Sequence, residues 1–177
     1  MNRYSDFYLN NVRLILLTKY SYKNIKDVEN FQHVNLSLNI KNNKHVISSL
    51  TALEFLSLRG LRSLVRSKSS NIYSKSKKEQ YILRYSMQNS NIFHFLENLI
   101  NFYLPRIRYF KGLPLNNFSN KGVYSFIFKD LLIFPELEEE LEIFYMLSNL
   151  KLDIMVGNNN NKGVFFLSLF NFPFQTT

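Results

Sequence analysis

The feature that most constrains this fold is an apolar helical pattern that runs directly into a proline. From Asn91 to Tyr103, apolar residues recur at a spacing of three or four, which predicts a helix with one buried stripe. The ring of Pro105 disfavours α-helical backbone at the preceding residue, so we expect the helix to stop at Leu104. The stripe consists of Ile92, Phe95, Leu96, Leu99, Phe102 and Tyr103.

Cationic and apolar residues are interleaved after this proline. We expect extended backbone here, in which neighbouring side chains point to opposite faces, so that Arg106 and Arg108 share one face. Gly112 permits a turn where the segment ends. The segment would therefore join a charged surface to a packed core. Its residues are Arg106, Ile107, Arg108, Tyr109, Phe110 and Lys111.

Two other segments, His33–Ile40 and Tyr81–Gln88, have apolar residues at every second position, which predicts half-buried strands. The opposite faces of these strands carry Asn35, Ser37 and Asn39 in the first, and Ile82, Arg84, Ser86 and Gln88 in the second. Further helices are predicted at Ser5–Tyr20 (apolar stripe Phe7, Val12, Ile15, Leu16), His45–Ser57 and Lys162–Phe170, and further strands at Gly122–Lys129 and Lys151–Val156. Because this order lacks regular βαβ alternation, we predict one α+β domain over residues 1–177.

The chain has a formal net charge of +9, which favours a polyanionic partner, nucleic acid before anionic membrane. Between Arg59 and Arg84 there are eight cations and a single acid, a composition that suits phosphate contact. We expect residues 67–80, rich in serine and lysine, to form an exposed basic loop. For Lys75–Lys78 alone, a merely solvated loop is an equal alternative. The cations are Arg59, Arg62, Arg66, Lys68, Lys75, Lys77, Lys78 and Arg84.

Residues suited to catalysis or metal binding do not cluster in this sequence. The absence of cysteine excludes disulfides, thiolate zinc sites and iron–sulfur clusters. His33, His45 and His94 are far apart, and no glycine-rich phosphate loop or nucleophile elbow is present. The acidic run from Glu136 to Glu142 fits a solvated helix face or an attraction for a basic partner. We therefore predict no catalytic residue, metal or cofactor.

No apolar run approaches the roughly 18 residues that span a bilayer, so we expect no membrane insertion. The first residues lack the patterns of a signal peptide and of a mitochondrial presequence. We therefore expect that, if the protein works in an organelle, it is made there.

Four motifs, in the same order, resemble those of the large-subunit ribosomal protein five family. The segment Pro105–Leu113 is similar to that family's PRIRDFRGL, and Phe118–Ser125 is similar to its FDGRGNYS. Ile133–Leu137 resembles IFPEI, and Phe172–Phe174 reads Phe-Pro-Phe, as the family does at its end. An Asp6-x-Tyr8 opening agrees as well.

The resemblance implies an antiparallel sheet with helices packed on one face, whose other face binds 5S rRNA in the central protuberance. It implies a structural protein and no enzyme. By position, the rRNA contacts would be Asn35, Ser37, Asn39, Arg62, Arg66, Lys68, Arg84, Ser86 and Gln88. A loop facing the P-site tRNA would carry Lys75, Lys77 and Lys78. Contacts with neighbouring ribosomal proteins, and with a small-subunit protein across an intersubunit bridge, would come from Arg106, Arg108, Lys111, Glu138 and Glu139.

The sequence departs from the family where RNA would bind. Leu36–Ile40 stands in place of a glycine-bearing LNMGVG, Gln88 replaces the arginine of a TLRG motif, and Ile72–Gln80 is a shorter, lysine-rich loop. The chain also uses Asn, Lys, Ile, Phe and Tyr heavily and holds only 5 glycines, as AT-rich genes encode. These departures favour an organelle-encoded version, mitochondrial first and plastid second, bound to 5S rRNA or its structural equivalent.

Two other classes of protein are alternatives. A homing endonuclease is also basic and organelle-encoded, but it needs clustered carboxylates for metal, and here the acids lie outside the basic tract. A peripheral membrane protein needs a helix divided sharply into cationic and apolar sides, and the basic tract has no helical pattern. The sequence favours a structural rRNA-binding component of an organellar large ribosomal subunit.

Overall fold

The computed structural model describes residues 3–22, 24–40, 45–57, 81–88, 90–119, 121–147, 149–157 and 160–175. The chain divides into two compact units. The first unit comprises Met1–Val34, Gln88–Phe126 and Asp153–Thr177, and the second comprises Asn35–Met87 and Ile127–Leu152. The predicted basic loop, residues 67–80, lies outside the described residues.

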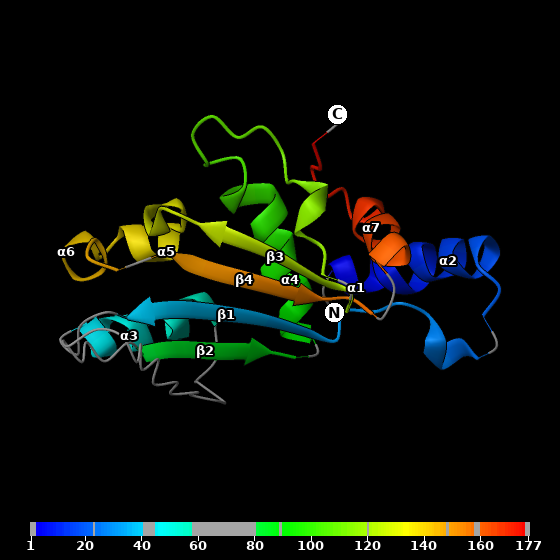
Figure 1. Ribbon diagram of the computed structural model, residues 1–177, viewed down its shortest axis with the longest axis horizontal. Helices are drawn as coiled ribbons and strands as arrows, with labels where there is room; N and C mark the ends of the chain where they lie inside the picture. The colour runs from blue at the N-terminus through cyan, green and yellow to red at the C-terminus, as the bar shows by residue number, and fades with distance from the viewer. Residues whose placement is uncertain are drawn as a thin grey trace, which may run out of the picture. The chain divides into compact units, whose positions relative to one another are not determined.

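Four strands form one sheet. They are β1 (His33–Ile40), β2 (Tyr81–Met87), β3 (Val123–Phe128) and β4 (Leu150–Met155). Their order across the sheet is β2-β1-β4-β3, and neighbouring arrows in Figure 1 run in opposite directions. The predicted α+β class, an antiparallel sheet with helices, is confirmed.

The strands form because one face of each is apolar. In β1, the side chains of Val34, Leu36, Leu38 and Ile40 are at most 4% exposed. In β2, the buried side chains are Leu83, Tyr85 and Met87. Alternate positions in both strands are polar and less buried, so the predicted period of two is confirmed.

In the second unit, three helices accompany the strands. Helix α3 (Val46–Ser57) packs against β2, α5 (Pro135–Glu138) and α6 (Leu141–Phe144). Ring contacts hold these pieces together: Phe55 lies 6.0 Å from Phe144 and Phe128 lies 5.1 Å from Phe134, between ring centroids. Pro135 begins α5, where its missing N–H costs no hydrogen bond.

The first unit opens with a nearly continuous helix made of α1 (Arg3–Phe7), a π-helical turn (Tyr8–Val12) and α2 (Arg13–Lys19). The predicted helix is confirmed, but part of the predicted stripe is wrong, since Phe7 is 37% and Ile15 is 41% exposed. The residues that face the interior are Tyr8, Val12 and Leu16. They are spaced by four, a spacing that the wider π turn keeps on one side of the helix.

The helix before Pro105 is confirmed as α4 (Ser90–Asn98) followed by a π-helical turn (Leu99–Tyr103). The expected exit from it is wrong. Leu104 keeps α backbone (φ −62°, ψ −43°) and donates its N–H to the carbonyl of Leu99 at 2.9 Å. Because proline clashes with the carbonyl four residues earlier in a regular α-helix, we attribute the widened last turn to Pro105.

The segment after Pro105 is also not extended as expected. Arg106 donates its N–H to the carbonyl of Tyr103, and Ile107 donates its N–H to that of Leu104, which makes two successive turns. Tyr109 then takes a left-handed backbone conformation, with φ 55°. The strict alternation predicted for Arg106 and Arg108 is therefore absent.

Helix α7 (Asn160–Leu169) completes the first unit and supplies its aromatic core. Phe166 is fully buried, and its ring lies 4.8 Å from that of Phe31 and 5.2 Å from that of Phe170. None of the helices in the described part of the chain is long and apolar enough to cross a membrane.

Candidate nucleic-acid interface

The polar side of β1 and β2 is the first candidate surface. In the second unit these strands are neighbours, so the structure brings their predicted rRNA contacts together. Asn35 and Ser86 are half-buried, whereas Asn39 and Arg84 are exposed. Amides, a hydroxyl and one guanidinium therefore lie on the side opposite the apolar core. Such groups can contact sugars, bases and phosphates.

Ser37 is the least accessible of these residues. Its side chain is 6% exposed, and its hydroxyl donates to the carbonyl of Lys151 at 3.4 Å. Lys151 belongs to β4, the strand beside β1, and its side chain is exposed. Sequence reasoning missed this cation because it could not tell which strand would pair with β1.

Gln88 follows β2 and is exposed in the first unit. In the same unit, β4 carries Asp153, which is 8% exposed and accepts a hydrogen bond from the hydroxyl of Ser125 at 2.6 Å. A hydrogen-bonded carboxylate at this place opposes phosphate binding. We therefore assign the stronger phosphate attraction to the second unit, around Arg84. Six predicted contacts lie outside the described residues: Arg62, Arg66, Lys68, Lys75, Lys77 and Lys78.

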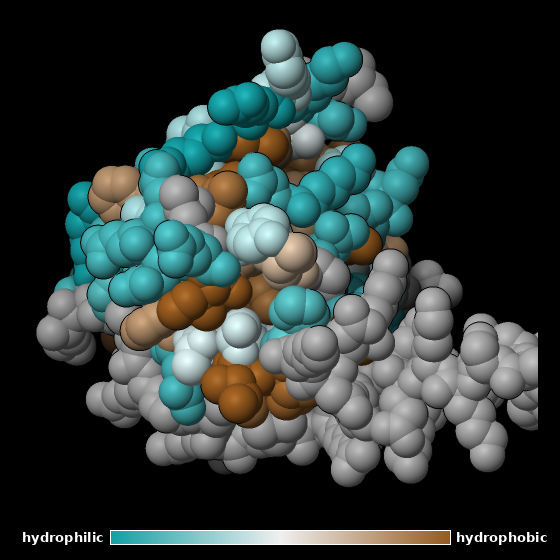
Figure 2. Space-filling view, turned by 90° about the vertical axis from the view of Figure 1, so that its left-hand side faces the viewer, coloured by the Kyte–Doolittle hydropathy of each residue, from teal (hydrophilic) through white to brown (hydrophobic). Residues whose placement is uncertain are grey.

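The residues predicted to contact other proteins fall in two places. Arg106, Arg108 and Lys111 are exposed in the first unit, and Glu138 and Glu139 are exposed in the second. Figure 2 views the side on which α5 and α6 lie in Figure 1, and hydrophilic side chains surround smaller hydrophobic patches there. Exposed apolar residues follow the acids in this region: Ile143, Tyr145 and Met146.

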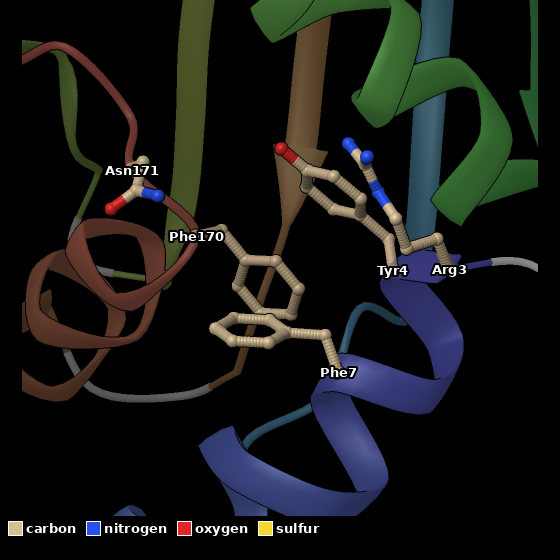
Figure 3. Close-up of a pocket in the computed structure, with 5 residues that line it drawn as sticks. All are labelled: Arg3, Tyr4, Phe7, Phe170 and Asn171. Carbon is tan, nitrogen blue, oxygen red and sulfur yellow. The ribbon is translucent and has the colours of Figure 1, made fainter.

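A hollow of about 220 Å³ lies between α1 and the end of α7 in the first unit. Figure 3 shows the rings of Tyr4, Phe7 and Phe170 gathered at one side of it. Tyr4 stacks on Phe170 at 5.8 Å, and burial raises the pKa of its phenol. Arg3 also lines the hollow, but its guanidinium is bound to Glu97 at 3.1 Å. The rings mainly fasten the two helices together.

A buried carboxylate fastens another part of the first unit. Glu29 is 8% exposed and accepts a hydrogen bond from the hydroxyl of Tyr22. Burial, followed by this hydrogen bond, raises the pKa of the Tyr22 phenol. Lys162 of α7 lies 3.8 Å from the carboxylate and 4.5 Å above the centre of the Tyr22 ring. Nothing in the local sequence predicts this cluster, because its members come from distant segments.

Groups that could perform chemistry do not converge in the described part of the chain. No three His, Cys, Asp or Glu side chains there are close enough to hold a metal ion. His94 is exposed, and His33 has a buried Nδ1 that lacks a hydrogen-bond partner among the described residues. The fold and its surfaces define a basic α+β protein built to bind other molecules through a polar side of its sheet.

Comparison with known proteins places this chain within that class. Residues 83–174, more than half of the chain, match the family model for the C-terminus of the ribosomal protein uL5 family. The chain therefore belongs to the ribosomal protein uL5 family. Members of this family are structural proteins and not enzymes, so this chain is a structural protein of the large ribosomal subunit.

Curated relatives match over nearly the whole chain. The large ribosomal subunit protein uL5 of Wigglesworthia glossinidia brevipalpis is 27% identical and covers 96% of this chain and 97% of its own length. That of Thermosipho africanus is 29% identical, with 95% and 94% covered. The large ribosomal subunit protein uL5m of Reclinomonas americana is 29% identical, with 81% of each chain covered.

Proposed function

We propose that this chain binds rRNA in the large ribosomal subunit through the polar side of β1 and β2. The observation that carries the proposal is the contrast between the two sides of these strands in the second unit. One side is closed by apolar residues, and the other presents Asn35, Asn39, Arg84 and Ser86. The net charge of +9 supports an RNA partner.

The RNA that we propose is 5S rRNA or its structural equivalent in the central protuberance. The loop with Lys75, Lys77 and Lys78 would face P-site tRNA. Contact with a basic ribosomal protein, across the intersubunit bridge or within the large subunit, is proposed for Glu138 and Glu139. Their exposure beside apolar residues of α6 supports this partner, because opposite charge directs the encounter and apolar area stabilises the contact.

We further propose that the ribosome is mitochondrial, with a plastid as the second choice. The residue usage and the likeness to uL5m of Reclinomonas americana support an organelle, while likeness to bacterial uL5 proteins makes a direct test necessary. Sedimentation of a lysate from isolated organelles provides it. We expect the protein to migrate with the large subunit and to stay bound at about 0.3–0.5 M salt, which strips purely electrostatic binders. Protein found only at the top of the gradient would refute the ribosomal assignment in that organelle.

The polar side of the second unit makes its own prediction. Arg84→Ala should weaken binding to rRNA purified from large subunits, because one exposed guanidinium no longer neutralises a phosphate. The slope of log affinity against log salt should decrease in magnitude by about 0.7–0.9. Filter binding over a series of salt concentrations measures both quantities.

The matched control for this measurement is Arg13→Ala. Arg13 lies on α2 in the first unit, away from the strands that carry the proposed contacts, and its removal costs the same single charge. We expect the wild-type salt slope for this variant. Equal slopes for Arg84→Ala and the wild type would remove Arg84 from the interface.

A further inference from the structure

We propose that Tyr109 stacks on an unpaired RNA base, while Arg108 and Lys111 bind the neighbouring phosphates. We call residues 105–112 the cationic tip. This site is additional to the polar side of β1 and β2, and it rests on the proposed function, rRNA binding. It differs from the protein contact that the resemblance implies for the same cations.

The two ends of the cationic tip are fixed in the first unit. Tyr103 and Leu104 are each 2% exposed on one side of it, and Leu113 is 2% exposed on the other. Leu113 donates its N–H to the carbonyl of Pro173 at 2.7 Å and accepts from the N–H of Gln175 at 3.0 Å. The tip is thus held between a buried helix end and a short pairing with the chain's last segment.

Gly112 allows this close pairing. Its φ of +100° is disfavoured for residues with a side chain, and a Cβ there would lie 3.0 Å from the backbone nitrogen of Gln175. The backbone of the tip is therefore set before any partner binds. A preorganised loop loses less conformational freedom on binding than a flexible one.

The middle of the tip is open to solvent. The side chain of Tyr109 is 96% exposed, so both faces of its ring are accessible. Its φ of 55° lies in the left-handed region, which asparagine, aspartate and glycine tolerate better than tyrosine. The family motif PRIRDFRGL has aspartate at this place. Neither packing nor backbone preference explains a tyrosine here, and an unfavourable backbone conformation at an exposed site suggests a binding role.

The charge around the ring selects RNA as the partner. Arg108 and Lys111 are exposed beside Tyr109, and the sequence holds no acid between Glu97 and Asp130. Single-stranded nucleic acid is bound by this combination, an aromatic ring for the base and cations for the backbone. A protein partner would have to be acidic at this place to match the charge.

A tryptophan at this position gives a local test. The chain contains no tryptophan, so Tyr109→Trp introduces the sole indole. We expect a single-stranded RNA of about 12 nucleotides, within the range that such sites span, to quench its fluorescence, and a duplex of equal length to quench it much less. Tyr145→Trp is the matched control: that residue is 62% exposed, follows the acidic run, and should show little quenching.

Affinity provides a second readout in the full-length protein. Tyr109→Asn keeps a residue that tolerates the left-handed backbone but removes the ring, and it should weaken binding of the same single strand roughly five- to fifty-fold. Tyr109→Phe keeps the ring and should bind as the wild type does. Arg108→Ala should reduce the salt dependence of binding and leave quenching by bound RNA in the Tyr109→Trp background.

The outcomes separate this proposal from the proposed function. If the protein binds rRNA but single-stranded RNA leaves the indole unquenched and Tyr109→Asn binds normally, the stacking site is refuted and rRNA binding stands. A change of indole emission with ribosomal proteins and not with RNA would make the tip a protein contact and overturn the proposal. If the full-length protein fails to bind rRNA at all, the proposed function fails with it.

Discussion

Replacement of Phe166 by alanine should lower the free energy of unfolding by about 3–5 kcal/mol. Phe166 is fully buried in the first unit, where its ring lies 4.8 Å from Phe31, 5.2 Å from Phe170 and 6.2 Å from Tyr8. Alanine removes the ring that joins these segments and leaves a cavity lined by stiff aromatic side chains, which collapse poorly into the space. Urea unfolding followed by circular dichroism measures the loss.

The control for this prediction is Phe102→Ala in the same unit. Phe102 is 59% exposed, so its removal leaves no cavity, and we expect a change within about 0.5 kcal/mol. The comparison holds the chemical change constant and varies only burial. Similar losses for the two variants would show that Phe166 does not organise the core of the first unit.

The strands could be predicted from the sequence because their signal is local. The period of two in His33–Ile40 depends only on neighbouring residues, and one-sided burial preserves it in the folded chain. Asn35 and Asn39 could be assigned to the opposite side for the same reason. The order of the strands is not a local property, so the cation of Lys151 beside β1 could not be anticipated.

Errors in the helices have a common origin in π-helical turns. A regular α-helical period placed Phe7, Ile15 and Phe102 on buried stripes, but all three are more than a third exposed. A π turn holds more residues than an α turn, so each one rotates the register of the residues that follow. No local pattern in the sequence announced these turns.

The cationic tip shows the same limit. Its composition was visible in the sequence, and the exposure of Arg106, Arg108 and Lys111 agrees with a charged surface. Its shape was not visible, because the turns and the conformation of Tyr109 depend on pairing between Leu113 and the segment around Phe174. That pairing joins residues 61 positions apart in the chain, a separation that follows from 174 − 113.

Replacement of Lys162 by methionine should lower the free energy of unfolding by about 1–3 kcal/mol. The Lys162 ammonium lies 3.8 Å from the carboxylate of Glu29 and 4.5 Å from the centre of the Tyr22 ring. Methionine has a similar length and keeps apolar contact with the ring, so the substitution mainly removes the charge. Glu29, 8% exposed, then keeps the Tyr22 hydroxyl but loses its cation. Urea unfolding at constant pH and salt measures the cost.

A double-mutant cycle with Glu29→Gln identifies the source of this cost. Glutamine retains an oxygen that can accept from Tyr22 and lacks the charge that requires a cation. In the Glu29→Gln background, Lys162→Met should therefore be less costly, with a coupling energy of about 1 kcal/mol or more. Lys19→Met provides a comparison, because the Lys19 ammonium lies 3.3 Å above the centre of the Phe165 ring. We expect it to cost about 0.5–1 kcal/mol. An equal cost of Lys162→Met in both backgrounds would show that the cation stabilises the tyrosine rings and not the buried carboxylate.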